Sequence, residues 1–307
     1  MDATTTVTPS APAPRPARRP SARRLAPPRM SALTWTGLVL LGLFLLLAVF
    51  GPMLAGDPAA RTGEQLASPS PHHLFGTDHL QRDLFARTAA GARVSLLVAV
   101  AGVAFGLLVA VPAGLVAGYF GGRWPDDLIM RLLEALQALP LFVFAMFVIG
   151  VTGTGDSHLG PVTVSATAKV ILLLGVGFIP YFARVTRSAT LVEAQEDYVD
   201  ALRVLGVPRW RIVGGELLVN VLPPVLVQAF LWLGIAIFAE SALSFLGLGI
   251  QAPAPSLGNI LGDATGYLLL GAWWYSIIPG LVILVATVGF NLAGDGLGDA
   301  LDADGRG

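Results

Sequence analysis

Two carboxylates inside apolar stretches are the groups in this sequence best placed to carry chemistry in a membrane. Glu134 lies near the start of the stretch Leu128–Gly150, and Glu240 lies near the end of the stretch Pro224–Leu243. A charged side chain at the middle of a bilayer costs about 2.5–3.5 kcal/mol on insertion scales, so each carboxylate is expected to face protein or water. From the sequence alone, each could line a transport pathway or hold the structure together.

Other kinds of chemistry find little support in the residue types present. The chain has no cysteine, which excludes disulfides and thiolate metal sites. His72, His73 and His79 lie close together without the spacing of a ligand set and are interpreted as polar loop residues. The sole lysine, Lys169, lies in ATAKV and not in a Gly-x4-Gly-Lys-Ser/Thr phosphate loop. We therefore predict no catalytic residue, no cofactor-binding residue and no metal site in this chain.

The composition indicates a membrane protein. Of the 307 residues, 54% are hydrophobic and only 13% are charged, whereas a soluble domain carries about 25% charged residues. A transmembrane helix needs about 20 consecutive apolar residues. Six stretches meet this requirement and predict an all-α membrane protein with six transmembrane helices: Thr34–Ala55, Val94–Phe120, Leu128–Gly150, Val162–Ala183, Pro224–Leu243 and Trp273–Ala293.

The remaining segments define the organisation of the chain. Residues 1–29 hold six arginines and one acid and are predicted to be a disordered cytoplasmic tail. Residues 30–93 are assigned to the first transmembrane helix and an extracytoplasmic loop. Residues 94–302 form a core of five transmembrane helices, and 303–307 form a short C-terminal tail. Within the core, Ser244–Gly271 is interrupted by glycines and prolines, which is typical of a re-entrant or interfacial segment.

The distribution of basic residues predicts the orientation in the membrane. With the N-terminus inside, the inner segments hold fourteen arginines and the outer loops hold four. Because basic residues are enriched in cytoplasmic loops, both termini and the loop 184–223 are predicted to be cytoplasmic. The formal net charge of the chain is −1, and no nucleic-acid partner is expected.

The loop 184–223 is unusually polar for a connection between two membrane helices, with five arginines and five carboxylates. Its pattern predicts a helix, a corner at Gly206 in a left-handed cap, and a second helix with Pro208 in its first turn. The apolar residues of the first helix recur at three- and four-residue steps: Leu191, Ala194, Tyr198, Ala201, Leu202 and Leu205. Such a structured loop indicates contact with a partner, although an ordinary surface hairpin would show the same periodicity.

This loop resembles a known family. The run YVDALRVLG at Tyr198–Gly206 is similar to the EAA loop of ABC-importer permeases, whose pattern is Glu-Ala-Ala, three residues, then Gly. Asp200, Ala201 and Leu202 take the EAA positions, and Gly206 takes the glycine position. Asp therefore stands in place of Glu, and Leu stands in place of the second Ala.

Further stretches narrow the resemblance to the C-type permeases of dipeptide, oligopeptide and nickel importers, which are inner membrane components of binding-protein-dependent transport systems. The stretches are His73–Leu96, Gly118–Pro140, Ala239–Leu261 and Phe290–Asp302. Gln81 stands where that family usually has glycine, and Gly298 stands where a basic residue is common. The resemblance covers Ala32–Asp302, which is essentially the whole chain outside the N-terminal tail.

The resemblance implies a type I ABC importer permease fold with a cytoplasmic coupling helix, in the cytoplasmic membrane of a prokaryote. It implies four kinds of neighbour: a second homologous permease subunit, two ATPase subunits that carry ATP and Mg, an extracytoplasmic substrate-binding protein, and membrane lipid. The residues implied to couple to the ATPase are Tyr198, Asp200, Ala201, Leu202, Leu205, Gly206 and Pro208.

The substrate expected from the resemblance is a di- or oligopeptide, and nickel or another small solute is the alternative. A different class of function, an ion-coupled secondary transporter acting alone, would use Glu134, Lys169 or Glu240 as relay residues. A membrane scaffold that transports nothing would fit the spans but would leave the loop at 184–223 without a purpose.

Overall fold

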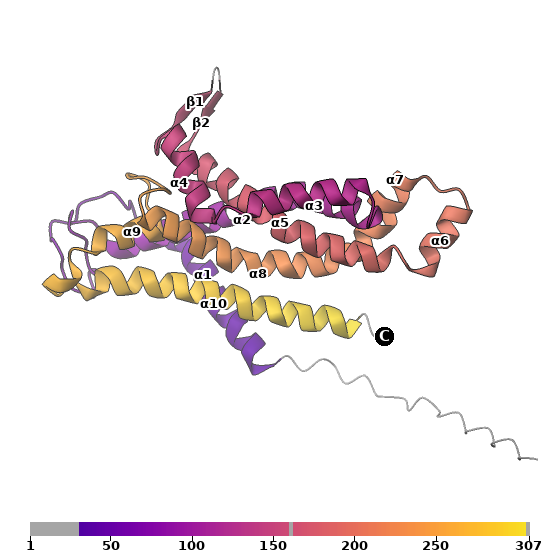
Figure 1. Cartoon of the computed structure of the whole chain (residues 1–307). Coiled ribbons are helices and arrows are strands. Elements are labelled where there is room, and N and C mark those ends of the chain that lie inside the picture. The colour runs from indigo at the N-terminus through magenta and orange to yellow at the C-terminus, as the bar shows by residue number, and fades with distance from the viewer. Residues whose placement is uncertain (1–30, 160–161, 305–307) are drawn as a thin grey trace, which may run out of the picture.

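The computed structural model describes residues 31–159 and 162–304, which fold as a bundle of long helices with one small β-hairpin (Figure 1). The predicted tail at 1–29 lies outside the described residues. The elements, in order, are α1 (Ala32–Leu54), α2 (Leu84–Tyr119), α3 (Trp124–Gln137), α4 (Leu141–Thr152), β1 (Ser157–Leu159), β2 (Val162–Val164), α5 (Ala166–Glu193), α6 (Asp197–Val204), α7 (Arg209–Arg211), the π-helical turn η1 (Ile212–Leu217), α8 (Leu218–Phe245), α9 (Leu257–Ala264), the 3-10 turn η2 (Leu268–Leu270) and α10 (Trp273–Asp304).

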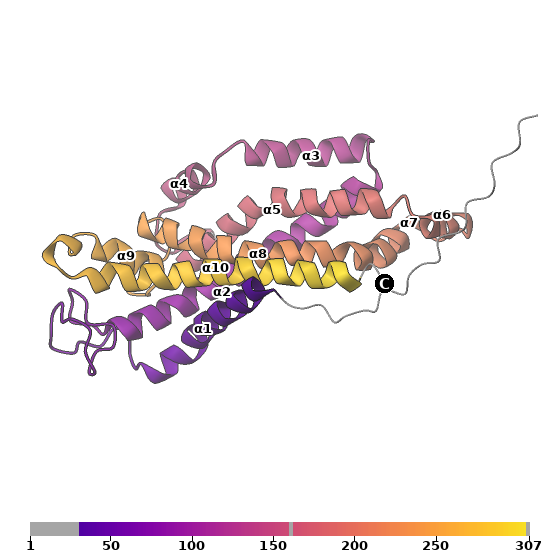
Figure 2. The same cartoon turned by 90° about the horizontal axis from the view of Figure 1, so that it is seen from below.

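Five of these helices are long and apolar enough to cross a membrane, and α3 with α4 would form a sixth span only as a bent pair. The predicted span Leu128–Gly150 is therefore divided between two helices that meet at an angle of 78°. The break falls at Pro140, which lacks the N–H that a continuing helix would need. Figure 2 shows α3 running along the outside of the bundle before α4 turns from it.

Two other predicted boundaries differ from the structure. Helix α2 begins at Leu84 and not at Val94, because the side chain of Asp83 accepts a hydrogen bond from the Ala86 N–H at 2.9 Å and caps the helix there. The start of the predicted fourth span, by contrast, is not helical. Val162–Val164 pairs in antiparallel register with Ser157–Leu159, and α5 starts only at Ala166.

The centre of the bundle is the pairing of α2 with α5, and glycines on α2 allow the two helices to approach closely. A Cβ added at Gly114 would lie 2.5 Å from Cβ of Thr186, and one added at Gly118 would lie 2.5 Å from Cβ of Thr190. Real Cβ atoms do not approach so closely, so only glycine permits these two crossings. Helix α8 packs on both α2 and α5, while α10 packs on α1 and α8.

The connections fall at two opposite ends of the bundle. Helix α6 and the end of α10 lie at one end, and the loop after α1 lies with α9 at the other (Figure 1). The sequence predicts the same grouping, with the loop 184–223 and the C-terminus on the inner side. Ser244–Gly271, predicted to be re-entrant or interfacial, contains the eight-residue α9 packed against α8 and α10.

Candidate functional site

Helix α6 is held to the bundle by its inner face. Val199 is fully buried, and Leu202 packs beside it against a cluster that contains Ile212 and Leu217. These two partners belong to η1, which continues directly into α8. The helix is therefore seated on the start of a membrane-spanning helix. Val199, the residue that anchors it, does not belong to the apolar set expected from the sequence.

A three-residue hydrogen-bond network joins α6 to both neighbouring spans. The Tyr198 hydroxyl donates to Oε1 of Glu193 at 2.8 Å and lies 3.0 Å from Nδ2 of Asn220, which donates to the same Oε1 at 2.8 Å. Burial, together with the hydrogen bond to Glu193, raises the pKa of the Tyr198 phenol above its ordinary value. The end of α5, the start of α6 and the start of α8 are thus tied together.

The corner after α6 has the geometry predicted from its glycine. Gly206 adopts φ +76°, in the left-handed region. Its N–H donates to the Arg203 carbonyl at 3.1 Å, and the Val207 N–H donates to the Leu202 carbonyl at 3.0 Å, which together form a Schellman cap. Pro208 lies immediately before α7 and not in its first turn. The corner is confirmed, and the proline is displaced by one residue.

The outer face of α6 is apolar and uncovered. Val204 is 88% exposed and Leu205 is 78% exposed, and Ala201 is exposed beside them. Ala201 and Leu205 belong to the periodic apolar set and to the residues implied to couple to an ATPase, and both are exposed in the structure. Asp200, on the same helix, forms an exposed ion pair of 2.8 Å with Arg203. Helix α6 therefore has apolar side chains on both faces, and an uncovered apolar face is typical of a protein interaction site.

The predicted first helix of the loop is interrupted. Leu191 lies in α5, which ends at Glu193, and the short break before Asp197 separates it from α6. Leu191 and Ala194 therefore do not share a helix with Leu202. The spacing of apolar residues does not reveal this break across Ala194–Glu196, because both helices pack on the same hydrophobic cluster.

Comparison with known proteins identifies the family. The model of the binding-protein-dependent transport system inner membrane component family matches residues 110–306, which include α6 and its corner. The chain belongs to this family. It is 36% identical to the dipeptide transport system permease protein DppC of Alkalihalophilus pseudofirmus, over 89% of this chain and 86% of that protein. The resemblance stated from the sequence is thereby confirmed.

Other relatives agree. The permease is 38% identical to a probable D,D-dipeptide transport system permease protein, DdpC, of Escherichia coli, over 89% of this chain and 88% of that protein. It is 39% identical to DppC of Bacillus subtilis, over 89% and 82%. Among solved structures, an inward-facing form of the MetNI methionine ABC transporter matches with a TM-score of 0.54 and 20% identity, covering 69% of this chain and 94% of that chain. This last match confirms the type I importer permease fold.

Of the two carboxylates in the apolar stretches, Glu240 is fully buried in the permease, surrounded by hydroxyl groups. Its carboxylate accepts from the Ser95 hydroxyl at 2.5 Å and from the Ser244 hydroxyl at 2.7 Å. Ser95 belongs to α2 and Ser244 to α8, and the Ser244 hydroxyl also accepts from the Ile250 N–H at 2.9 Å. Glu134, by contrast, is exposed on α3. Glu240 therefore occupies a packed position between helices.

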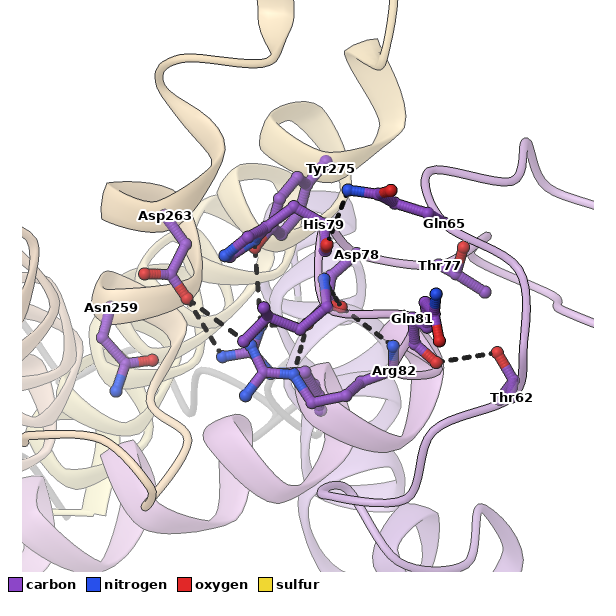
Figure 3. Close-up of polar contacts among 12 residues, drawn as sticks. Thr62, Gln65, Thr77, Asp78, His79, Gln81, Arg82, Asn259, Asp263 and Tyr275 are labelled. Carbon is purple, nitrogen blue, oxygen red and sulfur yellow. Dashed lines mark hydrogen bonds and ion pairs between the residues drawn. The ribbon is translucent and has the colours of Figure 1, made fainter.

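The opposite end of the permease carries a network of charged side chains that the sequence did not predict (Figure 3). Asp78 is completely buried, and its Oδ2 accepts from Arg82 Nε and from Arg87 Nη1, both at 2.6 Å. Burial alone would raise the pKa of Asp78, but the hydrogen bonds from Arg82 and the charge of Arg87 lower it below its usual value. Arg87 also reaches Asp263 of α9 at 3.3 Å, so the loop between α1 and α2 is joined to α9 through α2.

His73, His79 and Lys169 form hydrogen bonds with neighbouring residues. His73 Nδ1 lies 2.9 Å from Asp83, and His79 Nδ1 lies 2.9 Å from the Tyr275 hydroxyl. Within the residues that the structure describes, no group of three potential ligands converges on one point. Lys169 is buried near the start of α5 and donates to the carbonyls of Thr152 and Gly153 at 3.1 and 2.8 Å. It thereby ties α5 to the end of α4.

Proposed function

We propose that this chain is the permease subunit of an ATP-driven importer of di- or oligopeptides. The support for peptide is the substrate named for relatives that align over nearly nine-tenths of the chain: dipeptides for two of them and D,D-dipeptides for a third. A second permease subunit completes the translocation pathway, and an extracytoplasmic binding protein delivers the substrate. Both termini of the chain lie in the cytoplasm.

The observation that carries the proposal is the uncovered apolar face of α6. Two ATPase subunits bind ATP and Mg, and one of them receives Ala201, Val204 and Leu205 in a groove. Because the inner face of α6 is seated on η1 and tied by Tyr198 to α5 and α8, movement of the groove moves those helices. Such coupling requires that the groove contact α6 differently in the nucleotide-bound and nucleotide-free states.

A charge placed on the outer face of α6 tests this docking. The double change Val204→Asp and Leu205→Asp alters two side chains that are 88% and 78% exposed, so folding should be retained. We expect the ATPase subunits to be lost on purification and uptake to stop. Val192→Asp is the matched control, since Val192 is 67% exposed at the same end but lies on α5. Wild-type uptake by the double variant would refute the docking role of α6.

The substrate class is tested separately, on the partner binding protein. Titration calorimetry would compare the affinity of the binding protein for di- and oligopeptides with its affinity for nickel chelates, the two substrate classes implied by the resemblance. We expect peptide binding, and tight binding of a nickel chelate without peptide binding would replace peptide by metal while leaving the importer assignment in place.

A further inference from the structure

A pocket with three arginines lies between the end of α2 and the corner after α6, and the coupling role does not use it. It has a volume of about 480 Å³. Its lining contains no acidic residue: Tyr119, Gly121, Arg123, Arg203, Val207, Arg209 and Ile212. The guanidinium groups come from three separate elements, since Arg123 precedes α3, Arg203 belongs to α6, and Arg209 begins α7.

Only one of the three guanidinium groups is neutralised by a neighbouring acid. Arg203 is paired with Asp200 at the edge of the pocket and lies over the ring of Tyr119, with Cζ 5.4 Å from the ring centroid. Arg123 and Arg209 are exposed, and no carboxylate of the described residues lies within 4.0 Å of either side chain. The pocket therefore holds two uncompensated positive charges directed at a space large enough for a phosphate group. Arginine binds phosphate through parallel hydrogen bonds.

An apolar stripe starts next to this pocket. Trp124 directly follows Arg123, and Leu128 and Leu132 succeed it at four-residue steps, which places all three on one face of α3. They are 75%, 51% and 63% exposed. Exposed tryptophan is typical of the interface between membrane and water, and leucines beyond it are suited to acyl chains. The arrangement matches a molecule with an anionic head and an apolar tail.

We propose that this pocket binds the phosphate headgroup of an anionic membrane phospholipid, with its acyl chains lying along Trp124, Leu128 and Leu132. Basic pockets between membrane helices on the cytoplasmic side are suited to such headgroups. The bound lipid would bridge the start of α3 to α7 through Arg123 and Arg209, beside Arg203 of α6. The position of the coupling helix relative to the span would then depend on the anionic lipid content of the membrane.

The test is native mass spectrometry of the assembled importer purified with phosphatidylglycerol or with phosphatidylcholine. The variant carries Arg123→Gln and Arg209→Gln, and the control carries Arg211→Gln. Arg211 lies at the same end but stacks on Trp210 and does not line the pocket. We expect the double variant to retain phosphatidylglycerol about 30-fold more weakly, since each arginine contributes about a factor of five near an anionic headgroup. The control and phosphatidylcholine binding should be unchanged.

Three outcomes would overturn the proposal. Equal phosphatidylglycerol retention in the double variant and in the wild type would remove the arginines from lipid binding. Loss of the ATPase subunits from the double variant with unaltered lipid retention would assign the pocket to the protein interface. Displacement of the bound phosphatidylglycerol by millimolar inorganic phosphate would show that the pocket is a site for soluble anions and not for a lipid. Because the permease assignment does not depend on any of these results, it would stand in each case.

Discussion

Replacement of Gly206 tests the link between backbone conformation and coupling most directly. The residue adopts φ +76°, and a Cβ added there would meet no atom within 4 Å. The cost of a side chain is therefore conformational and not steric. A non-glycine residue in the left-handed region costs about 1–2 kcal/mol, and asparagine, which tolerates this region, costs less. The cap beyond α6 should weaken in the order Gly, Asn, Ala.

The expected size of the effect follows from this cost. A penalty of about 1–2 kcal/mol lowers the ratio of molecules with the left-handed corner to molecules without it by about 5–30-fold. We expect Gly206→Ala to reduce the number of substrate molecules imported per ATP hydrolysed, while Gly206→Asn retains most of it. The assay is uptake into vesicles together with ATPase activity, on variants inserted at equal levels. Equal activity of Ala and Gly, or a greater loss with Asn than with Ala, would refute the conformational reasoning.

Three further predictions concern the bundle and its two ends. Gly258→Ala should abolish folded protein, because its Cβ would lie 2.0 Å from the Ser241 carbonyl oxygen, whereas Gly42→Ala, with no atom within 4 Å, should leave the yield in mild detergent unchanged. Asp126→Ala should lower stability by about 1.5–3 kcal/mol, since Asp126 is almost fully buried and pairs bidentately with the partly exposed Arg187 at 2.5 and 2.7 Å; thermal unfolding compared with a matched surface change would show it. The stabilisation from Asp78, whose pKa is lowered on folding, is present above its ordinary value of 3.8 and is lost as the pH falls below it. Backbone hydrogen exchange in the loop between α1 and α2 should therefore accelerate below about pH 4. The Asp78→Asn variant should already exchange faster at neutral pH and should lose this pH dependence.

Much of the bundle could be predicted from the sequence, because apolar length, glycine and proline each act locally. Gly206 is one example, since a left-handed corner is nearly reserved for glycine. The size of the bend between α3 and α4 could not be predicted, for a physical reason. An apolar run has the same hydropathy whether its helix is straight or turns by 78° at Pro140. A proline shows that a helix is disturbed but not in which direction it continues.

Helix α6 shows a second limit of sequence reasoning. Periodicity identified an amphipathic helix but did not include Val199, which makes the buried contact. Both faces of α6 are apolar: one face packs against this chain, and the other face is exposed. A single sequence does not distinguish these two reasons for an apolar residue. The outer network of Asp78 and Arg87 was also missed, since it joins residues to Asp263, far away in the chain.

The continuity of α7, η1 and α8 allows a movement at one end of the permease to be transmitted to the other end. The helix runs without interruption for 37 residues, from Arg209 beside the coupling corner to Phe245, and Glu240 lies near its far end. At 1.5 Å per residue, Glu240 lies about 46 Å from Arg209 along the axis. A tilt of the rod by about 5° would shift one end by about 4 Å relative to the other. A small displacement at the α7 end can thus reach the packed hydroxyl groups around Glu240 without any change in secondary structure.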